Sequence, residues 1–195
     1  MLQVIFETEL ETLKSVYNQI IEDDLYLLGL GWGTTRPGHD EGSIRNHIAE
    51  LENNLSLIWE KGHLSEIEWW KLRILIHVHD IRKIHAKPGV SIDDPYSHAS
   101  LAKDLLAQYI DDQDLLNMIQ FHDEGFAIYR QFKKKGTYKK ERFDNLIANI
   151  KDWRIFIMFN IIDNCTEGKS REPLKWFIDE IARKIDVPTK ELFSL

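Results

Sequence analysis

The sequence contains a single cysteine, Cys165, so no disulfide can form within the chain. So little cysteine is typical of a reducing compartment, and we expect a cytoplasmic protein. Long apolar runs are also missing. The most apolar stretch, residues 155–162, is interrupted by Asn160 and is much shorter than the roughly 18 residues of a membrane-spanning helix. The N-terminus has no basic start, so we expect neither a signal peptide nor membrane binding.

An excess of basic residues is absent as well, because Lys and Arg total 25 against 32 for Asp and Glu, which gives a net charge of -7. Sequence-independent binding of nucleic acid needs a basic field, so we do not expect nucleic acid as a partner. A small anionic substrate would then need a local positive centre, such as a metal ion or a few lysines. The oligomeric state is left open by the sequence, with a homo-oligomer as one option.

Proline and glycine are scarce, at 5 and 10 of 195 residues, and no stretch alternates polar and apolar residues with period two. Apolar residues instead recur at helical spacing, which predicts an all-α fold of about six to seven helices. The length fits one domain, which we expect over residues 1–195. Its core would span about residues 43–164, with an N-terminal helix over 7–28 and a C-terminal helix over 172–185 packed on it.

Serines mark the starts of several helices within this core. Ser43, Ser65 and Ser97 are expected N-caps, because each precedes a segment with helical apolar spacing. The expected helices of the core cover residues 44–61, 66–85, 98–109, 113–131 and 141–164. The glycine-rich segment 29–42 lacks the pattern of a phosphate-binding loop, and we expect a surface connection or a lid there.

The most unusual stretch is residues 74–84, an apolar run that contains His79, Asp80 and Lys83. Apolar residues on nearly every side of a helix are typical of a buried helix. A buried carboxylate without a partner costs several kcal/mol, so Asp80 needs a compensating group. A metal ion is the first candidate for that group.

Other potential metal ligands lie on or beside the apolar faces of separate expected helices. These are His47, His98 and His122, and Asp163 ends the most apolar helix of the chain. Each alone is more often a hydrogen-bonded core residue or the polar end of a helix. Together they favour a metal site, since converging imidazoles and carboxylates are the usual ligands of Zn, Mn, Fe or Mg. A mixed set without cysteine points to a catalytic site with open positions.

The order of these residues in an all-helical chain resembles the HD-domain metal-dependent phosphohydrolase superfamily, over about residues 43–164. The residues that carry the resemblance are, in order, His47, His79, Asp80, His98, His122 and Asp163. The resemblance implies a helical bundle of the HD type and a divalent cofactor of one or two ions, with Mn, Mg, Co, Ni, Zn and Fe as candidates.

The resemblance also implies which of these ligands bind each metal ion. One metal ion would be held by His47, His79, Asp80 and Asp163. In members of the family with two ions, intervening histidines hold the second, and His98 and His122 stand at their places. Asp80 would then bridge both ions.

A lysine after the His-Asp pair carries the expected substrate contact. Family members with His-Asp-x-Gly-Lys have a lysine that faces the substrate phosphate, and Lys83 matches it, while Arg82 replaces the glycine. The resemblance therefore implies Asp80 and Lys83 as catalytic residues. The expected reaction is hydrolysis of a phosphomonoester or phosphodiester, of a nucleotide or related small molecule, by metal-activated water. Arg45 is a further candidate phosphate contact, although a surface salt bridge is its commoner role.

The sequence is also consistent with three other interpretations. Some proteins with this ligand set hold two irons and activate oxygen, which would make the chain an HD-type di-iron oxygenase. The chain could also be a metal-binding regulatory module with little activity, or a helical bundle whose polar core groups only satisfy one another. Asp123, in a second His-Asp pair, is either a partner that orients a histidine or part of a solvated helix edge.

Two further groups of residues have a functional and a structural interpretation. The lysines within residues 133–140 are more typical of a solvated turn than of a site for a polyanion. Trp32, Trp69 and Trp70 could line a base-stacking pocket, although core or interface packing is the commoner use of tryptophan.

Overall fold

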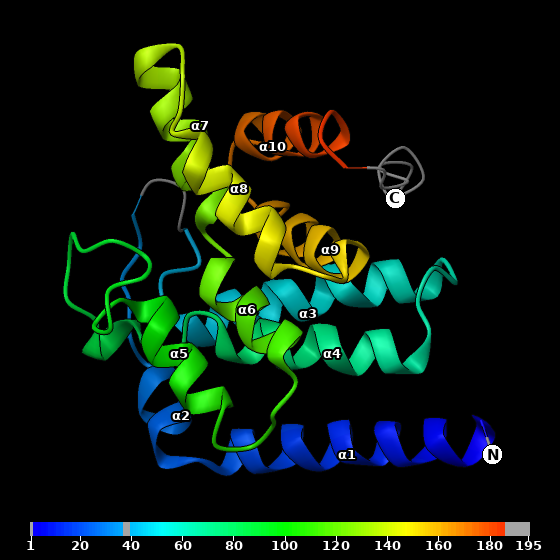
Figure 1. Cartoon of the computed structure of the whole chain (residues 1–195). Helices are drawn as coiled ribbons and strands as arrows, with labels where there is room; N and C mark the ends of the chain where they lie inside the picture. The colour runs from blue at the N-terminus through cyan, green and yellow to red at the C-terminus, as the bar shows by residue number, and fades with distance from the viewer. Residues whose placement is uncertain (1, 37–39, 186–195) are drawn as a thin grey trace.

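The computed structural model describes residues 2–36 and 40–185. Over these ranges it contains helices and no strands, which confirms the all-α class, and the helices pack into one bundle (Figure 1). The elements are α1 (Leu2–Glu22), α2 (Asp24–Gly29), α3 (Ile44–Glu60), α4 (Glu66–Val78), the short 3-10 helix η1 (Lys83–His85), α5 (His98–Leu106), α6 (Gln113–Phe121), α7 (Glu124–Lys135), α8 (Lys140–Asn149), α9 (Trp153–Asn164) and α10 (Glu172–Ala182).

Helix α4 is the central element of the bundle. It packs against α1, α3, α5, α6 and α9, and α1 runs alongside it at one edge of the molecule (Figure 1). Its residues Ile74, Leu75, Ile76 and Val78 are fully buried. The stretch that was unusually apolar in the sequence is therefore the buried end of the central helix.

The three serine N-caps are confirmed. Ser43, Ser65 and Ser97 each accept a hydrogen bond from the backbone N–H three residues further on. At Ser65 the side chain of Glu68 also accepts from the Ser65 backbone N–H, which completes a capping box. The starts of α3, α4 and α5 are thus set by local hydrogen bonds.

Two of the expected long helices are each divided by an aspartate. The segment 7–28 forms α1 and α2, because Asp23 accepts hydrogen bonds from the backbone N–H groups that begin α2. The segment 141–164 likewise forms α8 and α9, since Asp152 caps the start of α9. The predicted number of six to seven helices was therefore too low, and the C-terminal helix ends at Ala182 rather than at residue 185.

The other two divisions fall at the two His-Asp pairs. The helix expected over 66–85 ends at Val78, and the helix expected over 113–131 is divided between Phe121 and Glu124. In both places a histidine is the C-cap, and its ring Nδ1 donates to the backbone carbonyl three residues earlier. The ring N–H thus donates to a carbonyl at the end of the helix that would otherwise lack a partner, and the chain can turn at the following aspartate.

The start of the glycine-rich segment is not a surface connection, contrary to the prediction. Gly29 is the last residue of α2 and is buried, and a Cβ added there would lie 2.1 Å from the carbonyl oxygen of Ile81. The backbone N–H of Arg45 donates to the carbonyl of Leu30, so the segment also runs along the start of α3. Residues 37–39, which include His39, lie outside the described residues.

None of the helices in residues 2–36 and 40–185 is both long and apolar enough to cross a membrane.

Candidate metal centre

Asp80 lies between two groups of potential ligand atoms. His47 and His79 form one group with Asp80, and His98 and His122 form the other. Within each group the ligand atoms all lie within 4.8 Å of one another. The groups collect side chains from α3, the end of α4, the start of α5 and the end of α6, so residues far apart in sequence converge on one carboxylate.

Asp163, at the end of α9, adds a second carboxylate to the first group. Its Oδ1 atom lies 3.0 Å from the Nε2 atom of His47 and 3.9 Å from the Nε2 atom of His79. The Nε2 atom of His79 is also 3.5 Å from Oδ2 of Asp80. Asp163 is therefore close to both histidines of the first group, while the ligand atoms that all lie within 4.8 Å of one another are those of His47, His79 and Asp80.

The second group is just as compact. The Oδ1 atom of Asp80 lies 3.6 Å from Nε2 of His122 and 3.8 Å from Nε2 of His98. The two imidazole Nε2 atoms are 3.2 Å apart. Nitrogen and oxygen atoms spaced in this way surround a volume that one divalent ion can fill.

The orientation of two of the imidazoles is fixed by the helix ends that carry them. Because a carbonyl only accepts, Nδ1 of His79 donates to the carbonyl of Ile76 at 3.0 Å, and Nδ1 of His122 donates to that of Ile119 at 2.7 Å. The proton on Nδ1 leaves a lone pair on Nε2, which faces the cluster when the ring is neutral. Metal-binding histidines are commonly held in this way.

Two buried polar atoms of the cluster have no hydrogen-bond partner among the described residues: Nε2 of His79 and Oδ1 of Asp80. A buried polar atom without a partner costs about 1–3 kcal/mol. A bound cation would remove this cost at both atoms, because each is an electron-pair donor. The donor set therefore fits a divalent metal ion.

Two ammonium groups compensate the buried carboxylates of the cluster. Lys83 donates to Oδ2 of Asp80, and Lys169 lies 3.1 Å from Oδ1 of Asp163. Burial raises the pKa of each carboxyl, but the nearby lysine and histidines outweigh it and bring the pKa of Asp80 and of Asp163 well below the usual range. Both carboxylates are thus ionised and ready to act as ligands.

His79 and His122, the two histidines that end helices, differ in their proton affinity. Burial lowers the pKa of His79 to about 4, so its ring is neutral near pH 7. Burial acts in the same direction on His122, but the negative charges of Asp123 and Asp80 overcome it and raise the pKa to about 9. The ring of His79 can therefore act as a ligand directly, whereas that of His122 must first release a proton.

A cavity of about 470 Å³ opens onto the cluster. Its walls include His79, Asp80, His122 and Asp163, together with the cationic side chains Arg36, Lys83 and Lys169. The volume is within the range of small-molecule sites. Arg45 is exposed and is not among the lining residues, so the structure does not bring this predicted phosphate contact to the cavity.

Sequence reasoning missed Lys169 and left the position of Asp123 open. Lys169 follows α9 in a loop, and its contact with Asp163 depends on the left-handed φ of +77° at Gly168, so apolar periodicity gave no sign of it. Asp123 lies 3.3 Å from Nε2 of His98 and 3.7 Å from Nε2 of His122. It is thus a direct neighbour of the second group rather than only part of a helix edge.

Histidines of the same helix that were left out of the site do lie elsewhere. His77 contacts Tyr26 and Glu52 on another face of α4, and His85 is exposed at the end of η1. Of the three tryptophans considered for base stacking, Trp32 lines cavities near the cluster. Trp69 packs on Trp59 and Trp70 on Tyr17, so these two belong to the packing of the bundle.

No family model, curated protein or solved structure matches the chain. The evidence for its chemistry is therefore the sequence and the geometry of the cluster. The helical bundle holds a buried His/Asp group that could bind a metal ion, and this arrangement is compatible with an HD-type domain.

Proposed function

We propose that the chain is a metal-dependent phosphohydrolase that acts on a phosphomonoester or phosphodiester, such as a nucleotide or a related small molecule. The observation that carries this proposal is the position of Asp80. Its carboxylate is shared by two groups of ligand atoms, and its Oδ1 is buried without a hydrogen-bond partner. A buried carboxylate between clustered imidazoles has few uses other than binding cations.

The ligand assignment follows the two groups. His47, His79, Asp80 and Asp163 would hold one divalent ion. Asp80, His98 and His122 would hold a second ion, with Asp80 as the shared ligand. This assignment agrees with the resemblance to the HD superfamily, in which the same residues occur in the same order along the chain.

Hydrolysis requires an activated water and charge stabilisation at phosphorus. A bound divalent ion supplies a water of lowered pKa and polarises phosphoryl oxygens. In the reaction, a water oxygen forms a bond to phosphorus, the ester oxygen–phosphorus bond breaks, and the ester oxygen leaves with a proton that the water gives up. The residues of the chain position the phosphate for this exchange.

Lys83 and Lys169 would bind the substrate. Each ammonium neutralises a carboxylate of the cluster. When cations neutralise Asp80 and Asp163 instead, both ammonium groups can turn to phosphoryl oxygens in the same cavity. There they would stabilise the negative charge that develops in the transition state.

The cavity also favours this function over oxygen activation by two irons. Lys83, Lys169 and Arg36 line it together, and three cationic side chains suit an anionic substrate better than molecular oxygen. Iron content and the visible spectrum of the purified protein separate the two functions. A di-iron oxygenase would contain about two irons per chain and would absorb in the visible range.

The experiment that tests the proposal is metal analysis of protein purified without added metal, followed by hydrolysis assays. A panel of phosphomonoesters and nucleotides would be tested with Mn, Mg, Co and Ni. We expect bound divalent metal, turnover of at least one phosphate ester, loss of turnover after chelation and recovery after metal is returned. Hydrolysis that survives complete removal of metal would overturn the proposal, as would a chain that binds no divalent ion.

A further inference from the structure

A second, larger cavity adjoins the one that opens onto the cluster. Its volume is about 1030 Å³, and its walls come from the loop of residues 86–97, from α7 and from the start of α8. Lys83, Asp123 and Phe126 line both cavities, so the two spaces meet beside the cluster. A molecule held at the cluster can therefore extend into the second cavity, which we call the basic cavity.

The walls of the basic cavity carry many cations and few acids. The cationic residues are Lys83, Lys87, Arg130, Lys134, Lys135 and Arg142. Within the described part of the chain, Asp123 is the only acidic residue among the lining residues. This local charge is opposite to the net charge of -7 of the whole chain. Such a field attracts anions to one place on an otherwise acidic protein.

Most of these cations are not neutralised by the protein. Arg142 is paired with Glu124, and Lys83 is paired with Asp80. The remaining four form no ion pair with any residue in the described ranges; they are Lys87, Arg130, Lys134 and Lys135. Four cations gathered without counter-charges repel one another, and an anionic ligand would relieve that repulsion.

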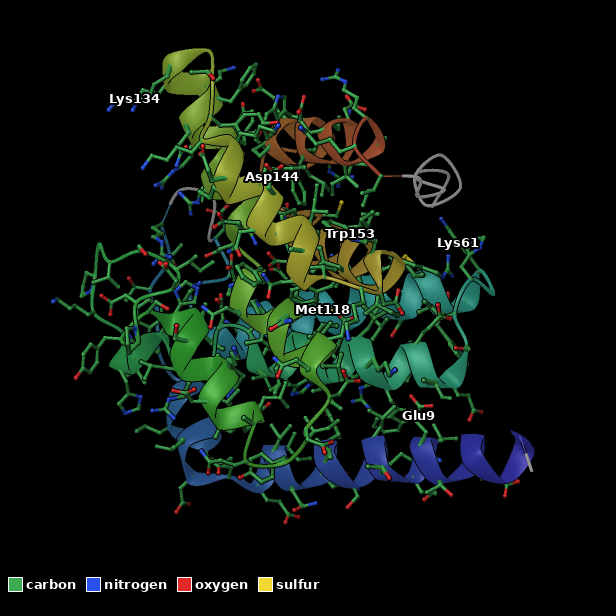
Figure 2. All side chains as sticks on the ribbon, viewed as in Figure 1. Glu9, Lys61, Met118, Lys134, Asp144 and Trp153 are labelled. Atoms are coloured by element: carbon green, nitrogen blue, oxygen red, sulfur yellow. The ribbon has the colours of Figure 1, made fainter. Side chains whose placement is uncertain are left out.

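Helix α7 arranges two of them along one side. Arg130 and Lys134 are one turn apart, so their side chains lie on the same face of the helix. The guanidinium of Arg130 lies 5.6 Å from the centroid of the Phe126 ring, the residue at the junction of the two cavities. Figure 2 shows Lys134 projecting outward from the last part of α7, which extends beyond the rest of the bundle.

The neighbouring lysines do not share this arrangement. Lys133 forms an ion pair with Glu172 at 2.6 Å, and Lys139 and Lys140 do not line the basic cavity. The lysines of residues 133–140 are therefore not one uniform solvated turn, because only some of them face the cavity next to the cluster.

We propose that the substrate is a small molecule with at least two phosphate groups. One phosphate reacts at the cluster, and another binds in the basic cavity through Arg130 and Lys134. The part of this inference that concerns the reacting phosphate rests on the proposed function. The basic cavity as a phosphate site stands on its own contacts, so the two can be tested separately.

The test measures binding of inorganic triphosphate and of inorganic phosphate to the metal-free protein, in which neither turnover nor chelation interferes. We expect triphosphate to bind at least about tenfold more tightly than phosphate, and added salt to weaken its binding. The variant Arg130→Gln/Lys134→Gln should bind triphosphate about tenfold more weakly, since it loses two charge-assisted contacts. Equal affinity for the two anions, or an unchanged affinity in this variant, would overturn the inference.

The matched control is Lys139→Gln/Lys140→Gln, which removes the same charge from exposed positions close to the cavity but outside it. It should change triphosphate binding by less than twofold. An equal loss in the control would mean that only net charge matters, and this too would overturn the inference. A short single-stranded oligonucleotide is the third probe, and binding tighter than that of triphosphate would replace the small molecule with nucleic acid.

Kinetics then link the basic cavity to the reaction. With the metal-loaded protein, we expect Arg130→Gln/Lys134→Gln to raise KM about tenfold for a sugar bisphosphate, and much less for the corresponding sugar monophosphate. A protein that binds triphosphate as expected but hydrolyses no phosphate ester would refute the proposed function and leave the phosphate site standing. If the protein hydrolyses monophosphates but binds triphosphate no more tightly than phosphate, only the phosphate site in the basic cavity is refuted.

Discussion

The two His-Asp pairs of this chain share a local structure but differ in their surroundings. His79 and His122 each end a helix, and each ring donates to the carbonyl three residues earlier. The aspartates that follow them are unlike each other: the Asp80 side chain is 8% exposed, whereas that of Asp123 is 46% exposed. Asp80 belongs to both groups of ligand atoms, and Asp123 to neither.

The difference shows that the dipeptide by itself does not define a ligand. Its local geometry only turns the imidazole Nε2 inward and brings the aspartate to a turn. What separates Asp80 from Asp123 is its position after α4, the helix with the most neighbours, where other ligands can surround it.

Replacing the aspartate of each His-Asp pair by asparagine should have very different effects on metal binding and hydrolysis. Asp80→Asn should lose both metal ions, and hydrolysis should fall by about 1000-fold, because the shared ligand is gone. Asp123→Asn should keep both ions and lose no more than about tenfold, as for a residue that orients a ligand. Metal analysis and steady-state kinetics of both variants make the measurement. Similar losses in the two variants would remove the distinction between the pairs.

The histidines of the two pairs should each account for one ion. His79→Ala and His122→Ala should both reduce the metal content from two ions to one per chain and slow hydrolysis by about 100-fold. His85→Ala is the control, since this residue is exposed and outside the cluster. The stoichiometry would be determined by elemental analysis. A content of two ions in either alanine variant would contradict the assignment of the two groups.

The lysine next to Asp80 should matter most when metal is absent. Lys83→Met leaves the buried Asp80 carboxylate without its cation, and we expect the metal-free protein to lose about 3 kcal/mol of unfolding free energy. Added divalent metal should restore much of this loss by taking over the positive charge. Denaturant unfolding with and without metal would show it. If the metal-free variant were as stable as the wild type, Asp80 would not depend on Lys83 for charge compensation.

The smallest effect is expected on another face of α4, where a partly buried network of hydrogen bonds links it to α3. Hydrogen bonds from His77 and Arg73 lower the pKa of Glu52, even though burial acts to raise it. The stabilisation by a carboxylate of lowered pKa is present above its ordinary value of 4.5 and is lost as pH falls through the folded pKa. Glu52→Gln should therefore cost about 2 kcal/mol at pH 7, and less as the pH falls below 4.5.

Unfolding measurements from pH 7 to pH 3 would follow this difference, and the metal content of Glu52→Gln should equal that of the wild type. A loss of metal would mean that the network at His77 and the cluster are coupled through α4. The difference between Asp80 and Asp123 would then depend partly on the hydrogen bonds around His77.

The sequence predicted the all-α class and the starts of three helices, because apolar periodicity and serine caps are local signals. It did not predict where helices stop at His79 and His122. Apolar residues continue past both positions with helical spacing, so the pattern shows no break. Each helix stops where the imidazole N–H of the histidine, instead of a backbone N–H, donates to a carbonyl of the last turn. The spacing of apolar residues does not reveal such a contact.

The candidate site was predictable to the extent that the order of its ligands is characteristic of a family. The histidines expected to bind metal gather around Asp80, and Asp163 lies beside two of them. Lys169 could not be foreseen, since it reaches Asp163 from a loop whose path depends on Gly168. Arg45 is two residues before His47 in sequence, but it lies on the exposed side of α3.

The close packing of Gly29 on the carbonyl of Ile81 has a consequence for mutational tolerance. Any side chain at residue 29 would push against the backbone one residue after Asp80. A saturation scan should therefore find residue 29 as intolerant as the ligands themselves, although it has no group that could bind a metal ion. For the same reason, a chain shortened to begin at residue 43 would lose Gly29, which packs against the turn that carries Asp80.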